Sequence, residues 1–162
     1  MNRLLSITGL LCALAAPAFV QAQIVVQANP NHEQLLASPD TRLAANKRLV
    51  YDFWREVVEA GHMELADKYM EESYIQHNPN VPTSRAAFVR YFSKMAKPKP
   101  IEPLVKAPLV SIVADGDFVV LSFVRDGSAS KDVSKHYTTT WFDMFRVQDG
   151  KIAEHWDGAL KP

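Results

Sequence analysis

The segment between residues 38 and 61 has apolar residues at helical spacing. They are Leu43, Val50, Phe53, Trp54, Val57 and Val58. Ser38-Pro39-Asp40 precedes them as a helix-start signal, because serine caps the first turn and proline fits the first helical position. Gly61 supplies a C-terminal stop. The pattern predicts an amphipathic helix with Ser38 as its cap and Pro39 as its first residue, which ends before Gly61.

Shorter elements follow this helix before the composition changes. A second helix is predicted over residues 62–70, and residues 74–79 form an extended piece that a proline ends. Thr83-Ser84 caps a third helix. The apolar face of this third helix consists of Phe88, Tyr91, Phe92 and Met95. Prolines between residues 98 and 103 then make a stiff connector.

Strand-forming residues dominate the chain after residue 108. The predicted strands are residues 109–114, 118–125, 137–147 and 152–156. Asp-Gly pairs at residues 115–116, 126–127 and 149–150 supply the turn signals. Helices first and antiparallel strands afterwards are typical of an α+β domain.

Alternation along the third strand decides which of its side chains share a face. Those on one face are Tyr137, Thr139, Trp141, Asp143, Phe145 and Val147. The turn at Asp149-Gly150 sets which residues of the last strand join them. A two-residue turn would place Glu154 and Trp156 beside Asp143.

A three-residue turn over residues 148–150, ending in a glycine bulge, would shift this register by one. It would place His155 opposite Asp143, with Asp157 next along. We favour this register because it gathers an acid, an imidazole and a second acid on a face otherwise lined with aromatic residues.

The N-terminus has the features of a secretory signal. Arg3 gives a positive start, an apolar run follows to Ala16, and Val20-Gln21-Ala22 is a small-residue cleavage pattern. We predict a signal peptide over residues 1–22, cleaved after Ala22, and a periplasmic or secreted protein. Residues 23–38 are predicted to be a poorly ordered leader or an arm over the domain surface, and residues 39–162 the folded domain.

Charge and cysteine content narrow the possible partners. The 162 residues carry 18 Lys and Arg against 18 Asp and Glu without a basic block, which argues against nucleic acid or a membrane surface. Cys12, the single cysteine, lies inside the predicted signal, in a poor context for lipid attachment. The mature chain therefore has no disulfide or cysteine–zinc site. The histidines lack the short spacings of a zinc site, so we expect no metal and no cofactor.

Two sequence signals carry a resemblance to a known family. They are YIQHNP at residues 74–79 and DMFRVQDGKIAEHWD at residues 143–157, with a helix–Gly–helix before them. Together they resemble the SnoaL-like polyketide cyclase family, which belongs to the nuclear transport factor 2-like and ketosteroid isomerase fold group. The resemblance covers roughly residues 40–157. It implies a cone-shaped, curved antiparallel sheet wrapped over three N-terminal helices, with an apolar pocket inside.

The resemblance also implies roles for particular residues. SnoaL-type cyclases use an aspartate as general acid/base in an aldol ring closure, and it corresponds to Asp143. Ketosteroid isomerase has an oxyanion-hole aspartic acid at the same place. Its tyrosine donor corresponds, counting from Gly61, to Trp54, and its aspartate base to Asn78. This chain therefore retains one carboxyl group and departs at the other two positions.

Asp143 and His155 are the candidate catalytic residues. Burial of a carboxyl group among aromatic side chains favours its neutral form, which can donate a proton to a substrate carbonyl. His155 is its proton partner. Both residues could instead have structural roles. The candidate substrate-binding residues are Trp54, Gln76, His77, Asn78, Tyr137, Trp141 and Asp157.

We therefore predict a cofactor-free acid/base enzyme for aldol cyclisation, isomerisation or dehydration of a small apolar carbonyl compound. The alternative is a module that binds a hydrophobic small molecule without catalysis, and a third reading is an assembly protein. A homodimer through the outer sheet face is also expected, because an apolar patch there needs a partner. The residues of this apolar patch are Phe142, Met144, Ile152 and Trp156.

Overall fold

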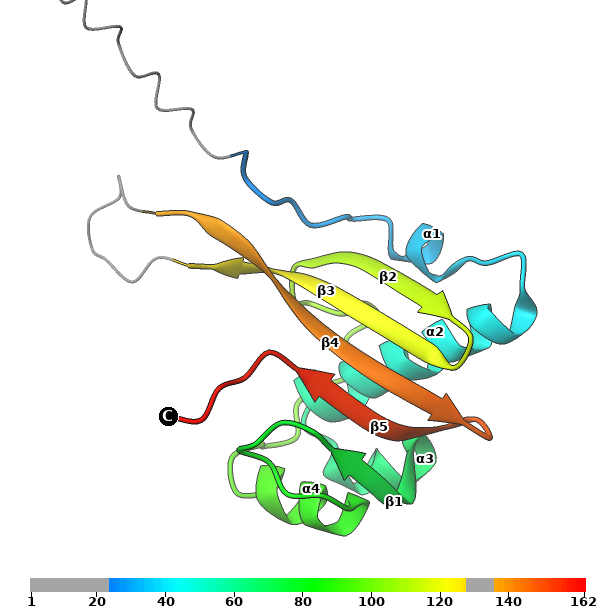
Figure 1. The fold of residues 1–162 in the computed structure, drawn as a ribbon, viewed down its shortest axis with the longest axis vertical. Helices are drawn as coiled ribbons and strands as arrows, with labels where there is room; N and C mark the ends of the chain where they lie inside the picture. Colours follow the sequence, from blue (N-terminus) through cyan, green and yellow to red (C-terminus); the bar gives the residue numbers. More distant parts are fainter. Residues whose placement is uncertain (1–23, 128–135) are drawn as a thin grey trace, which may run out of the picture.

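A curved five-stranded sheet forms one layer of the domain (Figure 1). The computed structural model describes residues 24–127 and 136–162, so the predicted signal peptide lies outside the described residues. The strands are β1 (Met70–Gln76), β2 (Leu109–Asp115), β3 (Phe118–Asp126), β4 (Thr138–Gln148) and β5 (Lys151–Asp157). Their order is β1-β5-β4-β3-β2. This confirms the predicted α+β class.

The pairing adds a feature that the sequence analysis did not anticipate. Strands β2 to β5 pair antiparallel, as predicted. Strand β1 instead pairs in parallel with β5 and forms one edge of the sheet. Because of this pairing, the YIQHNP segment lies directly beside the end of β5.

The helices are short except for one. They are α1 (His32–Leu36), α2 (Thr41–Phe53), the π-helix η1 (Trp54–Glu59), the 3₁₀-helix η2 (Met63–Leu65), α3 (Ala66–Tyr69) and α4 (Arg85–Phe92). Figure 1 shows α2 running behind the sheet, while α4 lies beside β1. Among residues 24–127 and 136–162, no helix has both the length and the apolar character needed to cross a membrane.

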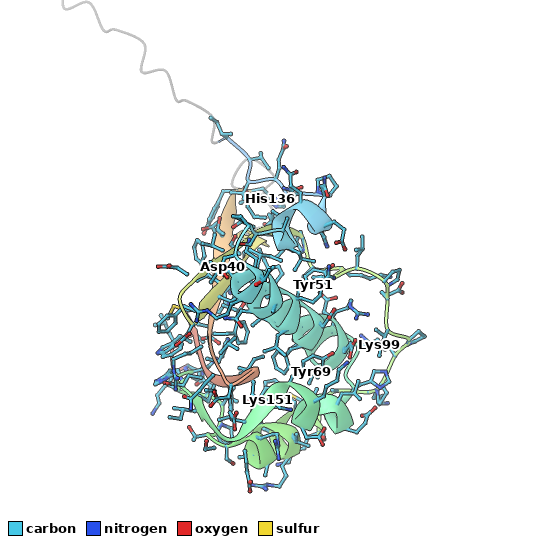
Figure 2. All side chains as sticks on the ribbon, turned by 90° about the vertical axis from the view of Figure 1, so that its right-hand side faces the viewer. Asp40, Tyr51, Tyr69, Lys99, His136 and Lys151 are labelled. Carbon is cyan, nitrogen blue, oxygen red and sulfur yellow. The ribbon has the colours of Figure 1, made fainter. Side chains whose placement is uncertain are left out.

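The long helix begins two residues later than predicted, and Ser38 does not cap it. Asp40 is the N-cap, and its Oδ1 accepts hydrogen bonds from the backbone N–H groups of Arg42 (2.8 Å) and Leu43 (3.1 Å). Asp40 lies at the upper end of α2 in Figure 2. A carboxylate caps better here because it also complements the positive end of the helix dipole. Gly61 ends the helical segment with φ at 77°.

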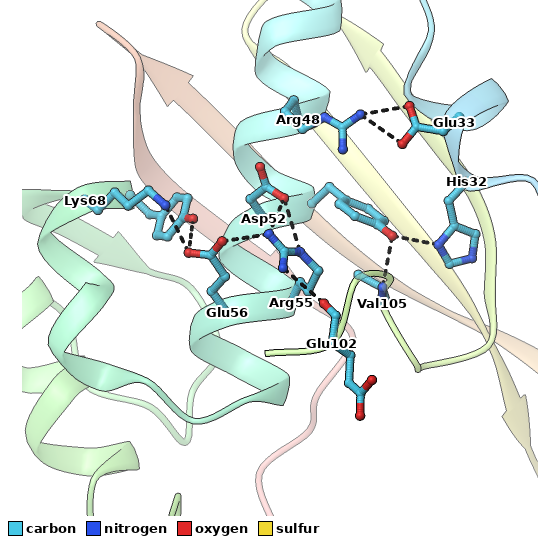
Figure 3. Close-up of polar contacts among 11 residues, drawn as sticks. His32, Glu33, Arg48, Asp52, Arg55, Glu56, Lys68, Glu102 and Val105 are labelled. Atoms are coloured by element: carbon cyan, nitrogen blue, oxygen red, sulfur yellow. Dashed lines mark hydrogen bonds and ion pairs between the residues drawn. The ribbon is translucent and has the colours of Figure 1, made fainter. Parts of the chain in front are cut away.

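The segment predicted to be a poorly ordered leader or an arm over the domain surface contains α1 and packs on the domain, as the second of these two interpretations has it. Leu36 is buried, and the backbone N–H of Asn29 donates to the carbonyl of Leu109 on β2 (2.8 Å). The Tyr51 hydroxyl accepts from the backbone N–H of Val105 (2.9 Å) and forms a second hydrogen bond with Nδ1 of His32 (2.8 Å). These contacts hold the arm against α2 and the proline connector (Figure 3).

A polar cluster joins the outer side of α2 and η1 to α3 (Figure 3). The Glu56 carboxylate accepts hydrogen bonds from the Tyr69 hydroxyl, from Lys68 (3.0 Å) and from Arg55 (2.7 Å). Burial opposes the charge on Glu56, but the hydrogen bonds from Tyr69 and Lys68 outweigh it. Together with the nearby cations they lower the pKa of Glu56 below its usual 4.5.

Glu56→Gln should lower the free energy of unfolding by about 1–3 kcal/mol at neutral pH, because it removes the charged acceptor of a buried network. Because the pKa of Glu56 is lower in the folded state, its contribution is present above pH 4.5 and is lost as pH falls further. Urea unfolding at several pH values should therefore show a weaker acid destabilisation in the variant. Glu33→Gln, at an exposed ion pair with Arg48, is the control. An equal loss in both variants would contradict the prediction.

The β4–β5 hairpin has a different turn from the one predicted. Asp149 (φ 49°) and Gly150 (φ 73°) form a two-residue turn, closed by the pair Gln148 and Lys151. A bulge at Ala153 then shifts the register, so that Arg146 pairs with Glu154 although Val147 pairs with Ile152. The favoured three-residue turn was therefore wrong.

The bulge nevertheless brings His155 and Asp157 to the same face of the sheet as Asp143. Asp143 lies opposite Asp157, and Phe145 lies opposite His155 two pairs further along, with the pair Met144 and Trp156 between them. All four residues therefore face the inside of the sheet. The predicted clustering of the two acids and the imidazole is confirmed, but His155 is diagonal to Asp143 and not directly opposite.

The same bulge changes the predicted outer patch. Ile152 turns inward and is fully buried in the core, so its placement on the outer face was wrong. Phe142 is 56% exposed, and Met144 and Trp156 are half-buried on the outer face. The patch is smaller than expected, and the homodimer stays a prediction.

Candidate functional site

The inner face of the sheet and the helices line a partly open cavity of about 170 Å³. Its walls come from α2, η1, η2, β1, α4, β4 and β5. The lining residues are Phe53, Trp54, Val58, Met63, Tyr74, Gln76, Asn78, Val81, Phe88, Phe92, Ala96, Asp143, Phe145, His155 and Asp157. The lining is mostly apolar, with polar side chains contributed by β1, β4 and β5.

The π-helical turn brings Trp54 into this cavity. Helix α2 widens into η1 at Trp54, so that Trp54 and Val58 both line the cavity together with Phe53. The indole ring stacks on Phe123 of β3, with centroids 4.7 Å apart. Its Nε1–H is buried and has no hydrogen-bond partner among the described residues. Such π-turns occur frequently at functional sites.

Asp143 and His155 form a buried pair at the wall of the cavity. Oδ1 of Asp143 lies 3.0 Å from Nε2 of His155, and the residues are 4% and 7% exposed. The His155 ring packs on Phe145, with centroids 4.7 Å apart. The second oxygen of Asp143, Oδ2, is buried and has no partner among the described residues. A buried carboxyl oxygen at the cavity wall is therefore left unsatisfied, which is unusual in a folded protein and calls for an explanation.

The neighbouring hydrogen bonds define where His155 carries its proton. The backbone N–H of Asn78 can only donate, and it donates to Gln76 Oε1 (3.0 Å). The same Oε1 lies 2.9 Å from Nδ1 of His155, so Nδ1 must be the donor. In the neutral ring, Nε2 then has a lone pair that faces Oδ1 of Asp143. This contact requires one proton, which the two residues share.

Asp157 is held as a carboxylate beside this pair. Its Oδ2 accepts from Nδ2 of Asn78 (2.7 Å), and its Oδ1 accepts from the backbone N–H of Ala159 (2.8 Å). The Asn78 amide cannot be reversed, because its Oδ1 accepts from the backbone N–H of Asn80 (2.8 Å). Gln76 and Asn78 thus line the cavity, and their amides are used to orient His155 and Asp157.

The sequence analysis missed Tyr74, which is a polar group of the cavity. Its hydroxyl accepts a hydrogen bond from Nε2 of Gln76 (3.0 Å), and the residue is 2% exposed. Burial raises the pKa of Tyr74 far above its usual range, and the charges of Asp157 and Asp143 raise it further. The hydroxyl therefore keeps its proton. Alternation from Asn78 and Gln76 back to Tyr74 was the signal that could have identified it.

The structure gathers six of the nine predicted site residues around the cavity. They are Trp54, Gln76, Asn78, Asp143, His155 and Asp157. Their roles stay predictions, because the structure holds no ligand.

Three predicted site residues lie elsewhere. His77 is on the outer face, where it stacks on Trp156 at 4.4 Å and contacts Glu154 (2.9 Å), because alternation turns it away from Gln76. Tyr137 precedes β4 and is 52% exposed. Trp141 is half-buried under the Arg125 guanidinium, 4.6 Å from the ring centroid. None of the three lines the cavity, so the structure does not bring them together with the other six, and their role in binding stays a prediction.

The pair and its neighbour also have the composition of a metal-binding group. Asp143, His155 and Asp157 each offer one ligand atom, and these atoms lie within 4.8 Å of one another. The sequence analysis predicted that these three residues would cluster, but it judged metal binding from histidine spacings alone and did not consider this cluster as a metal-binding group. Each residue already has a hydrogen-bond partner that accounts for its orientation without an ion.

Comparisons with solved structures find several distant likenesses. A protein of Acidithiobacillus ferrooxidans classed as a polyketide cyclase is 20% identical, with 70% of this chain and 86% of that chain covered and a TM-score of 0.49. An epoxide hydrolase of M. tuberculosis is 14% identical, with coverages of 70% and 80% and a TM-score of 0.48. A Xanthomonas campestris protein with a cystatin-like fold is 17% identical, with coverages of 70% and 91% and a TM-score of 0.48.

A comparison with curated protein sequences finds no significant match. The family comparison is informative, because the model of the SnoaL-like domain matches residues 50–155. This range includes η1, the YIQHNP segment, Asp143 and His155, and therefore most of the cavity. The chain belongs to the SnoaL-like domain family.

Proposed function

We propose that the protein is a cofactor-free acid/base enzyme that acts on a small apolar carbonyl compound. One observation carries this proposal: Asp143 lines an apolar cavity and has one buried oxygen without a partner among the described residues, while its other oxygen shares a proton with His155. A carboxyl group in such a position can exchange a proton with a bound molecule. Membership of the SnoaL-like family agrees with a pocket for a small molecule.

The chemistry begins with the shared proton on His155, so that Asp143 is a carboxylate. Its Oδ2 removes a proton from the carbon next to the substrate carbonyl. The electron pair of the broken C–H bond enters a new C=C bond, and negative charge develops on the carbonyl oxygen. Return of the proton from Asp143 to another carbon gives an isomer. If the enolate attacks a second carbonyl, the same proton goes to the alkoxide that forms and gives an aldol product. If the substrate has a hydroxyl group on the next carbon, the proton goes to that group, which leaves as water as the C–O bond breaks, and the product is an unsaturated carbonyl compound.

The surroundings support this role for the pair. Gln76 keeps Nδ1 of His155 protonated, so that Nε2 alone exchanges a proton with Asp143. The Asp157 carboxylate lies beside the pair and stabilises positive charge on the ring. We also propose that the protein works after export, on the basis of the signal pattern in residues 1–22.

The proposal can be tested without knowing the natural substrate. Cyclohexanone in D2O should exchange its α-protons for deuterium faster in the presence of the purified protein, as followed by proton NMR. Addition of EDTA should leave the rate unchanged, since no step uses a metal. Exchange no faster than in buffer, although the ketone binds, would favour the alternative of a non-catalytic binding module.

A further inference from the structure

We infer that the cavity accepts a single-ring or short-chain carbonyl compound, and that its oxygen accepts hydrogen bonds from the Tyr74 hydroxyl and the Trp54 indole. The inference rests on the proposed function, because it concerns the substrate of the same site. It adds two donor residues and an upper limit on substrate size.

The size limit follows from the volume of the cavity. A cavity of about 150 Å³ lined by apolar side chains binds benzene, and this cavity measures about 170 Å³. Pockets for drug-sized ligands begin at about 300 Å³. One six-membered ring therefore fits inside, whereas a compound of three or four fused rings does not.

The walls that set this volume are rigid aromatic rings. Phe53 contacts Phe145 and Phe88, with ring centroids 6.0 Å apart in both pairs. Phe88 in turn contacts Tyr74 at 5.9 Å and Phe92 at 4.6 Å. Enlarging the cavity would require several of these rings to move together, which close packing opposes.

Tyr74 supplies the first donor. Its hydroxyl oxygen accepts from Gln76 Nε2, whose identity as the amide nitrogen follows from the bond between Asn78 N–H and Gln76 Oε1. The proton of the Tyr74 hydroxyl is thus left to donate, and no acceptor for it is found among the described residues. A bound carbonyl oxygen would satisfy it and would be stabilised as negative charge develops.

Trp54 supplies the second donor. The indole Nε1–H is a donor only, and it is buried in the cavity wall with no acceptor among the described residues. Leaving a buried donor without a partner is unfavourable. An oxygen-bearing ligand removes this penalty, whereas a pure hydrocarbon of the same size does not. The site therefore selects for oxygen as well as for size.

A series of ketones tests both statements by binding alone. Cyclohexanone, 2-tetralone and anthrone contain one, two and three rings, and methylcyclohexane is the matched compound without oxygen. The ¹H–¹⁵N spectrum reports on the Trp54 indole directly, with its signal assigned by Trp54→Phe. We expect cyclohexanone to shift this signal downfield, methylcyclohexane to leave it in place, and anthrone not to bind. Binding that strengthens from cyclohexanone to anthrone would overturn the size limit.

Tyr74→Phe keeps the ring and removes the donor. It should weaken cyclohexanone binding about five- to tenfold, the loss expected for one hydrogen bond. Tyr69→Phe is the matched control, because Tyr69 is equally buried but donates to Glu56 and does not line the cavity. Unchanged binding in Tyr74→Phe would overturn the donor assignment even if α-proton exchange continues. Binding that depends on Tyr74 without any exchange would instead reject the proposed function and leave this inference standing.

Discussion

Asp143→Asn should lower the rate of catalysed α-proton exchange by about a hundredfold or more, the usual contribution of one acid/base group. Asparagine retains the shape of the side chain and can still contact His155 and the ligand. It cannot take a proton from carbon, because an amide oxygen is far less basic than a carboxylate. The rate in D2O measured by NMR at saturating cyclohexanone separates this loss from any change in binding.

The variant should bind the ketone nearly as the wild type does. Its thermal stability should be equal or higher, since the substitution removes a buried ionisable group. Asp115→Asn is the matched control on the exposed end of β2 and should retain the full rate. An exchange rate in Asp143→Asn within a factor of about two of the wild type would remove Asp143 from the mechanism.

The clustering of Asp143, His155 and Asp157 was predictable because alternation in strands relates residues two apart irrespective of tertiary context. The sequence predicted where the turn lies, at Asp149-Gly150, but not how many residues it contains. Type and register depend on the bulge at Ala153, which has no signature of its own in the sequence. The sequence analysis expected a three-residue turn and no bulge. The structure has a two-residue turn and a bulge, and the two differences offset each other. Asp143, His155 and Asp157 were therefore placed on one face correctly, but for a partly wrong reason.

Features that depend on distant packing could not be predicted. The π-turn that directs Trp54 into the cavity gives up regular helical hydrogen bonds, and it forms where the indole packs against Phe123. The parallel pairing of β1 with β5 joins segments that are almost eighty residues apart. That pairing brings Gln76 to His155, so the control of the histidine proton was visible only in the structure.

Trp141 and Tyr137 show the limit of the same alternation rule. Both were assigned to the cavity because they share a face with Asp143. Alternation gives the face and not the distance along the strand, and the helices cover only the part of that face near Asp143 and Phe145. Positions nearer the start of β4 lie beyond this cover, where Tyr137 is exposed and Trp141 packs under Arg125.

Gln76→Leu should lower the exchange rate by about ten- to a hundredfold, the range typical of a residue that orients a reacting group through a hydrogen bond. Gln76 is a positioning residue: its Oε1 accepts from Nδ1 of His155 and thereby leaves Nε2 to face Asp143. Without that acceptor, the ring is free to adopt the other tautomer, which has its proton on Nε2. A wrong tautomer severely impairs catalysis by a histidine pair.

Gln76→Glu separates this role from simple packing, because glutamate retains an oxygen that accepts from both Nδ1 of His155 and the backbone N–H of Asn78. ¹⁵N NMR should show the Nδ1–H form of His155 in the wild type and in Gln76→Glu, but a mixture of tautomers in Gln76→Leu. The exchange rate should follow the same order. Gln148→Leu, at the exposed β4–β5 turn, should change neither quantity. A loss of activity in Gln76→Leu with His155 still purely in the Nδ1–H form would contradict this role of the hydrogen bond from His155 to Gln76. The loss would then have to come from the Tyr74 hydroxyl, to which Gln76 Nε2 also donates.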